Sequence, residues 1–179
     1  IFGVRYSVIG EVVKNFAGVP GRMEEIKLGQ PFRVIVDFAH TPNALEQVLT
    51  ELRKQLFSPL GSARDKNKLI LIFGCAGLRD HAKRPMMGEI AKRLADAVIV
   101  TAEDPRTEKL DDIFNQITDG DDWFRREDDR QKAINLAVGM AGPGDIVVAT
   151  GKGHEKSMCF GITEYPWSDR EAFKKAIKQ

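Results

Sequence analysis

The stretch Val34-Ile35-Val36-Asp37-Phe38-Ala39-His40-Thr41-Pro42-Asn43 decides the fold of this 179-residue chain. A short apolar run rich in branched residues is typical of a buried strand, and Pro42 suits the first turn of a following helix. Asp37 and His40 are therefore expected at or just past the carboxyl end of that strand. Ligands of open α/β sheets bind at this end of the strands. The stretch thus predicts a sheet and the edge that carries its functional site.

The same order of strand, polar loop and helix recurs three more times. The predicted elements are strands at 32–39, 68–74, 97–101 and 145–150, a short edge strand at 123–124, a polar loop at 58–67, and helices at 42–56, 85–95, 109–118, 128–140 and 169–178. Such alternation predicts an α/β fold with a Rossmann-like, open, mostly parallel sheet and helices on both faces. Right-handed crossovers then bring the loop after each strand to one edge.

Composition and charge exclude several classes of protein. Hydrophobic residues make up 42% and charged residues 30% of the chain, as in soluble domains that bury a core. The 27 basic and 26 acidic residues nearly balance, which argues against nucleic-acid binding through a basic face. No apolar run approaches the ~20 residues that span a bilayer. Cys75 and Cys159 lack disulfide or metal-ligand spacing, so a reducing, cytoplasmic location is expected.

Residues 1–20 do not resemble the rest of the chain. Their apolar residues have loosely helical spacing, and Gly18-Val19-Pro20-Gly21 then breaks the chain. We expect residues 1–20 to be the tail and linker of a preceding domain, and residues 21–179 to form the main domain. The sequence begins with Ile1 and not with an initiator methionine, and its first residues do not have the pattern of a signal peptide. The chain is therefore expected to come from a longer protein.

The first two polar loops carry charged residues that suit a ligand. An acid at a buried strand end, such as Asp37, is costly unless paired, so we expect a functional role for it and for His40. The alternative is that Asp37 caps a helix. The Gly74–Pro85 loop leads into a helix and suits an anion, although it lacks the G-x-G-x-x-G fingerprint. Arg79 and Lys83 suit carboxylate or phosphate groups there; for Lys83 a solvated surface position is the alternative.

The third and fourth loops combine acids, glycines and basic residues. Glu103-Asp104-Pro105-Arg106 can clamp a zwitterion, with the acids on its ammonium group and the arginine on its carboxylate. The alternative is an internally paired turn. Gly151-Lys152-Gly153-His154-Glu155 is not a phosphate loop. Its glycines allow the backbone close to a ligand, and Glu155 presents a carboxylate.

These four loops, in this order, resemble the C-terminal domain of Mur ligases, most closely the UDP-N-acetylmuramyl-tripeptide synthetase (MurE) branch of that family. The segment from Gly18 to Glu24 is similar to the hinge by which the family's central domain enters its C-terminal domain. The resemblance covers nearly the whole chain.

The resemblance implies a cytoplasmic, three-domain enzyme of peptidoglycan synthesis. Such ligases use ATP and Mg²⁺ to activate a carboxylate of UDP-MurNAc-L-Ala-D-Glu as an acyl phosphate, which the amine of an amino acid then attacks to give an amide. The central domain supplies the phosphate loop and most of the nucleotide and metal contacts. No G-K-[ST] phosphate loop occurs in these 179 residues, so this chain alone is not expected to be catalytically competent.

The resemblance also assigns roles to individual residues. Asp37 and His40 match positions near the catalytic cleft and the nucleotide, together with Asn43 and Lys83. The incoming amino acid is implied to be held by Arg79, Glu103, Asp104, Arg106, Gly151 and Glu155. No metal ligand is implied in this domain.

Four positions depart from the family's usual residues. Diaminopimelate-adding members of the family typically have the motif Asp-Asn-Pro-Arg. In this chain, Glu103 and Asp104 replace the first two residues of that motif. The retained Arg106 would meet a distal carboxylate and favours meso-diaminopimelate over lysine. The extra charge of Asp104 could instead favour a more cationic substrate or mark a paralogue. Leu78 and Ala76 replace an acid and a glycine.

Other functions remain open from the sequence. The chain could be a Rossmann-like module that binds a dinucleotide or another small ligand without ligase activity. It could belong to a folate polyglutamylase, although Asp-x-Ala-His-Asn-Pro is then expected and Thr41 differs from it. A non-catalytic, Mur-like interaction protein is the third alternative.

Overall fold

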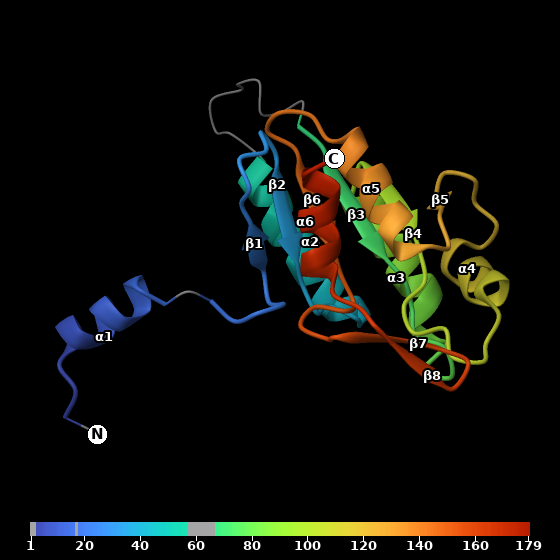
Figure 1. Cartoon of the computed structure of the whole chain (residues 1–179), viewed down its shortest axis with the longest axis horizontal. Coiled ribbons are helices and arrows are strands. Elements are labelled where there is room, and N and C mark those ends of the chain that lie inside the picture. Colours follow the sequence, from blue (N-terminus) through green and yellow to red (C-terminus); the bar gives the residue numbers. More distant parts are fainter. Residues whose placement is uncertain (1–2, 17, 57–66) are drawn as a thin grey trace.

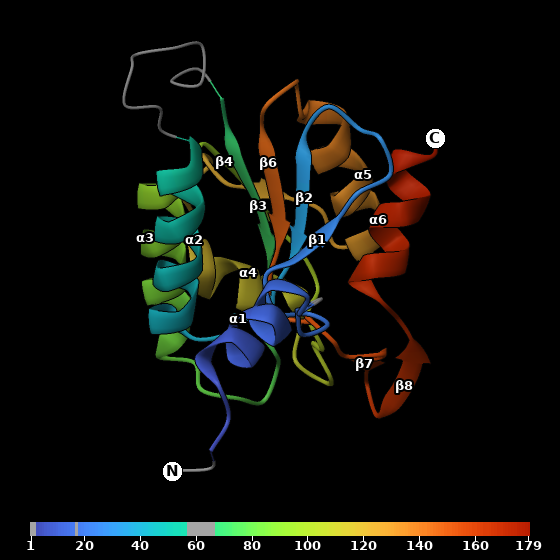
Figure 2. The same ribbon diagram turned by 90° about the vertical axis from the view of Figure 1, so that its left-hand side faces the viewer.

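The computed structural model describes residues 3–16, 18–56 and 67–179, and its main body has three layers (Figure 2). The central sheet has the strand order β1-β2-β6-β3-β4-β5. Its strands are β1 (Glu24–Ile26), β2 (Arg33–Val36), β3 (Leu69–Phe73), β4 (Ala97–Val100), β5 (Arg125–Arg126) and β6 (Ile146–Ala149). Strands β2 to β6 pair in parallel, and β1 is antiparallel to β2 at one edge. The predicted Rossmann-like, mostly parallel sheet is therefore confirmed.

Helices cover both faces of this sheet. The helices are α1 (Tyr6–Lys14), α2 (Pro42–Leu56), α3 (Lys83–Leu94), α4 (Leu110–Thr118), α5 (Arg130–Met140) and α6 (Asp169–Ile177). One core contains side chains of α2, α3 and α4, and the other contains those of α5 and α6. Figure 2 shows α2 and α3 on one side of the sheet and α5 and α6 on the other.

Alternate residues of each central strand enter these two cores. Leu69, Leu71 and Phe73 of β3 join the first core, whereas Ile70 and Ile72 join the second. All five are fully buried. A strand buried on both faces has no polar side to show, which explains why the central strands read as continuous apolar runs.

The structure differs from the predicted elements at several edges. The edge strand lies at 125–126, not 123–124, and α3 begins at residue 83, two residues early. A hairpin of β7 (Ser157–Phe160) and β8 (Thr163–Pro166) was not predicted. All but the last residue of the predicted 58–67 loop lies outside the described residues. In the described part of the chain, no helix combines the length and hydropathy needed to cross a bilayer.

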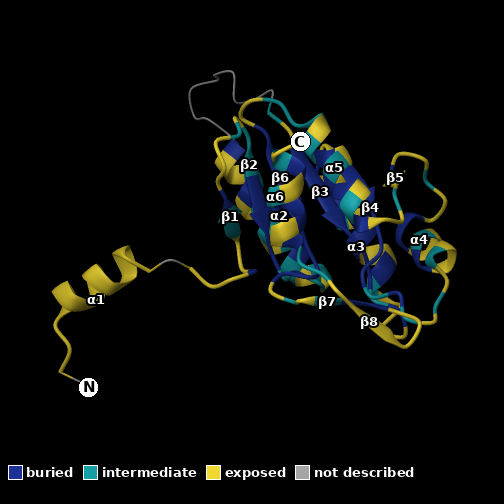
Figure 3. Ribbon diagram, viewed as in Figure 1, coloured by how far each residue is buried: buried dark blue, intermediate teal, exposed yellow. Residues whose placement is uncertain are grey.

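Helix α1 stands apart from the main body (Figure 1). None of its residues is buried, and its apolar side chains, including Val12 and Val13, are exposed (Figure 3). This is the segment predicted to be the tail of a preceding domain, and that assignment stays a prediction.

Candidate functional site

The four predicted loops interlock at the carboxyl edge of the sheet. The Gly77 amide of the loop after β3 donates to the Asp104 carbonyl after β4, at 2.9 Å. Lys83, at the end of that same β3 loop, donates its Nζ to the His40 carbonyl after β2, at 2.7 Å. Lys152 after β6 contacts the Asp104 carboxylate. The four loops that follow β2, β3, β4 and β6 thus form one continuous rim. This agrees with the parallel pairing of these strands, which brings their carboxyl ends to one edge of the sheet.

Asp37 uses both carboxylate oxygens within this rim. It is buried at the end of β2, where Oδ1 accepts from the Ala39 amide and Oδ2 from the Met23 amide, both at 2.8 Å. Asp37 therefore does not cap α2, which was its alternative reading. Its carboxylate ties the segment before β1 to the edge of the sheet.

An aromatic cluster surrounds Phe38. Its ring centroid lies 4.6 Å from that of His40 and 5.0 Å from that of His154, and the Arg22 guanidinium carbon lies 4.6 Å from the Phe38 ring. Such a cation over a ring face is attracted by the ring's quadrupole. A Cβ atom on Gly21 would come within 2.1 Å of the His154 amide nitrogen, so the hinge segment packs directly on the fourth loop.

A fully buried arginine holds the second and third loops together. Arg84 donates from Nη1 to Glu108, at 2.5 Å, and to Gln116, at 2.8 Å, and from Nη2 to the Ala76 carbonyl, at 3.1 Å. The Glu108 carboxylate also accepts from the Leu78 amide. Mainly because of the hydrogen bonds from Arg84, the pKa of Glu108 falls to about 2. Glu108 is therefore a structural anion at all physiological pH values.

The structure brings two of the nucleotide-side candidates together. His40 is half-buried, and its carbonyl accepts from Lys83. Asn43 is exposed in the first turn of α2, where its Oδ1 accepts from Gln47 at 3.4 Å. Arg79 is exposed on the turn that follows β3. His40 and Lys83 thus share one contact, whereas Asn43 and Arg79 face solvent.

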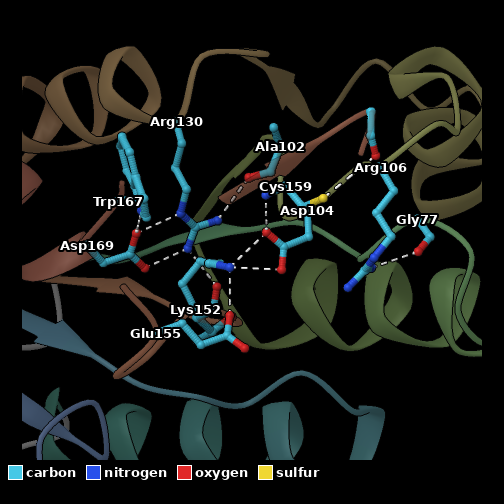
Figure 4. A network of polar contacts seen from close by, with 12 residues as sticks. Gly77, Ala102, Asp104, Arg106, Arg130, Lys152, Glu155, Cys159, Trp167 and Asp169 are labelled. Atoms are coloured by element: carbon cyan, nitrogen blue, oxygen red, sulfur yellow. Dashed lines mark hydrogen bonds and ion pairs between the residues drawn. The ribbon is translucent and has the colours of Figure 1, made fainter. Parts of the chain in front are cut away.

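Lys152 forms ion pairs with two acids, Asp104 and Glu155, that were predicted to hold the incoming amino acid (Figure 4). Lys152 is buried, and its Nζ lies 2.9 Å from both Asp104 oxygens and 2.6 Å from Glu155 Oε2. The Asp104 side chain is 14% exposed, whereas that of Glu155 is 39% exposed. The Glu155 side chain is therefore the more exposed of the two, and its ion pair with Lys152 is made through Oε2.

Arg106 lies half-buried beside this acidic network. Its Nη1 donates to the Gly77 carbonyl at 2.9 Å, which fixes one corner of the guanidinium. Its backbone amide donates to the Cys159 carbonyl at 3.1 Å, and its carbonyl accepts from the Gly161 amide at 2.8 Å. The remaining guanidinium N–H groups are free to bind a carboxylate, because no other hydrogen bond of that guanidinium occurs within the described residues.

Glu103 is buried beneath Gly151. Gly151 has φ +102°, a backbone conformation that other residues rarely adopt, and a Cβ atom there would lie 2.1 Å from Glu103 Oε2. That oxygen has no hydrogen-bond partner within the described residues. Burial raises the pKa of Glu103 to about 7, against the opposing influence of Arg130, Lys83 and Lys152. A neutral carboxyl agrees with the missing partner, since an unpaired buried charge would be costly.

A buried ion pair beneath the rim was not predicted. Arg130, at the start of α5, donates to both oxygens of Asp169, at 2.8 and 2.7 Å, and to the carbonyls of Ala102 and Thr150 (Figure 4). Trp167 also donates to Asp169. The pair therefore supports the third and fourth loops from below. Arg130 lies in the first turn of a helix, at the positive end of the helix dipole, where a cation is unfavourable, but this position alone does not distinguish a surface charge from a buried pair.

The order of these loops has a counterpart among known protein families. Residues 21–153 match the family described as Mur ligase, glutamate ligase domain. The chain belongs to the Mur ligase family. The resemblance inferred from the four loops is therefore confirmed.

Individual Mur ligases are similar to nearly all of this chain. It is 40% identical over 179 residues to the UDP-N-acetylmuramoyl-L-alanyl-D-glutamate–2,6-diaminopimelate ligase of Fusobacterium nucleatum subsp. nucleatum, covering 98% of this chain and 35% of that protein. It is 44% identical over 175 residues to the UDP-N-acetylmuramyl-tripeptide synthetase of Roseiflexus sp., covering 93% and 33%. A solved UDP-N-acetylmuramoyl-L-alanyl-D-glutamate–2,6-diaminopimelate ligase superposes with a TM-score of 0.79 at 35% identity, covering 98% of this chain and 35% of that one. The chain thus spans about a third of the length of these Mur ligases.

Metal binding was not expected in this Mur ligase domain. Over residues 3–16, 18–56 and 67–179, no group of three or more His, Cys, Asp and Glu side chains could hold a metal ion.

Proposed function

We propose that this chain is the amino-acid-binding domain of an ATP-dependent Mur ligase. The complete enzyme would add a diamino acid, meso-diaminopimelate, to UDP-MurNAc-L-Ala-D-Glu in the cytoplasm, during peptidoglycan synthesis. The observation that carries the proposal is the guanidinium of Arg106, which is fixed at one corner by Gly77 and otherwise free beside an acidic network. Relatives named as 2,6-diaminopimelate ligases support the same substrate.

A zwitterionic amino acid needs both signs of charge at this rim. Arg106 would bind the distal carboxylate of the substrate, because a planar guanidinium matches a carboxylate in two parallel hydrogen bonds. Arg79, exposed on the neighbouring loop, would bind a second carboxylate. Glu155 contacts Lys152 through Oε2, so its other carboxylate oxygen, Oε1, would accept a hydrogen bond from an ammonium group of the substrate. Gly151 would let the substrate approach the backbone.

The charge of Asp104 does not favour a more cationic substrate in this arrangement. Both of its oxygens contact Lys152, so this carboxylate is engaged within the domain and is not presented to the substrate. The substrate would contact Arg106 instead, and lysine has no distal carboxylate that could bind to this guanidinium. We therefore infer meso-diaminopimelate, not lysine.

The other half of the cleft would come from preceding domains. Residues 1–20 would belong to the central domain, and the exposed apolar side of α1 would pack against the rest of it. The carboxylate of UDP-MurNAc-L-Ala-D-Glu would be activated as an acyl phosphate by ATP and Mg²⁺ held mainly by that domain, with ADP as the leaving group. The nucleotide side of the cleft would be lined by His40, Lys83, Asp37 and Asn43. The Phe38 cluster on the same side contains aromatic rings and the cationic Arg22. Closure would hold the amine close to the activated carboxylate and exclude water.

Replacing Arg106 with alanine tests this assignment. In the complete ligase that carries this chain, we expect Arg106→Ala to raise the KM for meso-diaminopimelate by roughly 10–150-fold, because a hydrogen-bonded charge contributes about 1.5–3 kcal/mol. The KM for lysine should stay within about twofold, since lysine lacks the group that Arg106 binds. Steady-state phosphate release with each amino acid measures both constants.

A matched control is Arg93→Ala, an exposed arginine on α3 that is paired with Glu46. It should leave both KM values unchanged. Equal KM values in wild type and Arg106→Ala for meso-diaminopimelate would remove Arg106 from the site. Activity with glutamate and a folate acceptor would favour a folate polyglutamylase, and tight binding of NAD without ligase activity would favour a dinucleotide-binding module.

A further inference from the structure

Two residues of the third loop have an unusual backbone conformation. Asp104 has φ +42° and Arg106 has φ +52°, on either side of Pro105. Residues other than glycine rarely occupy this left-handed region, and they do so where the surrounding structure holds them. The geometry of Arg106 is therefore imposed by its neighbours and is not intrinsic to the loop.

The Asp104 side chain makes three contacts, all within the domain. Its two oxygens contact Lys152 Nζ at 2.9 Å, and Oδ1 also accepts from the Cys159 amide at 2.8 Å. Its backbone carbonyl accepts from the Gly77 amide. Both oxygens are engaged, so little of the carboxylate remains for a ligand.

The hairpin of β7 and β8 links Asp104 to Arg106. The Cys159 amide of β7 donates to the Asp104 carboxylate, and the Cys159 carbonyl accepts from the Arg106 backbone amide. The Gly161 amide, in the turn of the hairpin, donates to the Arg106 carbonyl, and Arg106 forms a parallel bridge with Phe160. The hairpin thus engages both the amide and the carbonyl of Arg106 along one edge of its backbone. The Asp104 carboxylate fixes the same hairpin against the loop (Figure 4).

We propose that Asp104 is a positioning residue that fixes Arg106 through the β7–β8 hairpin and does not bind the ammonium group of the substrate. This inference rests on the proposed function, in which Arg106 binds the distal carboxylate of the amino acid. Asparagine, usual in the family at this position, would keep an acceptor for the Cys159 amide but would leave Glu155 as the one carboxylate contact of Lys152 in the described part of the chain.

The test compares two amino acids in the complete ligase. Asp104→Ala should raise the KM for meso-diaminopimelate about tenfold and leave the KM for lysine within twofold, because only the former uses Arg106. Asp104→Asn keeps an acceptor for the Cys159 amide, so it should raise the meso-diaminopimelate KM less than threefold. In an Arg106→Ala background, Asp104→Ala should add less than twofold, since residues acting through one contact are not additive.

A variant of the hairpin provides a second test of the proposal in case Asp104→Ala does not fold. Gly161 has φ +61° and open space around its Cα, so Gly161→Ala strains the turn without a steric clash. It should raise the KM for meso-diaminopimelate at least threefold and spare that for lysine.

Each other outcome overturns one claim. Equal losses with both amino acids, or full additivity with Arg106→Ala, would make Asp104 a direct ligand or a general structural residue. Normal meso-diaminopimelate KM values in both Asp104→Ala and Gly161→Ala, with Arg106→Ala impaired, would refute the positioning role alone. A normal KM in Arg106→Ala would instead refute the proposed function.

Discussion

Arg130→Met is expected to lower the free energy of unfolding of the chain by about 3–5 kcal/mol, the range for removing one partner of a buried ion pair. The variant leaves Asp169 fully buried without its guanidinium and leaves the carbonyls of Ala102 and Thr150 without a donor. Burial disfavours the charged guanidinium, but Asp169 more than offsets this and raises the pKa of Arg130. The loss should also loosen the third and fourth loops.

Urea unfolding of the wild type and the variant at one pH measures this loss. The matched control is Arg126→Met, which removes a partly exposed arginine that pairs with Asp111 and Asp128. Exposed ion pairs contribute about 0–1 kcal/mol, so the control should change little. A loss below about 1 kcal/mol for Arg130→Met, equal to the control, would contradict a supporting role for the buried pair.

Glu103 is expected to make the chain less stable as the pH rises. Its pKa is raised from 4.5 to about 7, so between these values the folded chain keeps a proton that the unfolded chain has lost. The free energy of unfolding therefore falls as the pH rises through this window, and it levels off above the folded pKa. At about 1.4 kcal/mol for each tenfold change in proton affinity, the fall is on the order of 3 kcal/mol.

Urea unfolding between pH 4.5 and 8 measures this slope against that of Glu103→Gln. Glutamine stays neutral throughout, so the variant should lose the slope assigned to Glu103. Glu89→Gln, exposed on α3, serves as the control and should keep it. Glu108 titrates near pH 2, outside the window, and does not confound the comparison. Identical pH profiles for wild type and Glu103→Gln would show that Glu103 is ionised in the folded chain.

The sheet and its functional edge could be predicted because parallel strands carry a strong local signal. Val34–Val36 and Leu69–Phe73 are buried on both faces, so their sequences are uninterrupted apolar runs. The polar residues directly after such runs must lie at one edge, which is why Asp37 and Arg106 could be placed there. The exact edge strands were less certain because β5 has only two exposed residues.

The unpredicted features depend on contacts between distant residues. The exposed strand β8 shows no alternation of buried and exposed positions, so the hairpin carries little local pattern. Arg130 and Asp169 are 39 residues apart, and neither position alone distinguishes a surface charge from a buried partner. Asp104 and Lys152 are similar: the sequence offered Asp104 as a ligand for an ammonium group, and the structure pairs it with a lysine from another loop.

The most direct test of the central claim is the amino-acid preference of the complete ligase that carries this chain. With UDP-MurNAc-L-Ala-D-Glu, ATP and Mg²⁺, kcat/KM measured for meso-diaminopimelate and for lysine should favour meso-diaminopimelate by at least about tenfold, since one additional charged contact contributes about 1.5–3 kcal/mol. Equal values, or a preference for lysine, would contradict the account of Arg106 as the residue that selects the substrate.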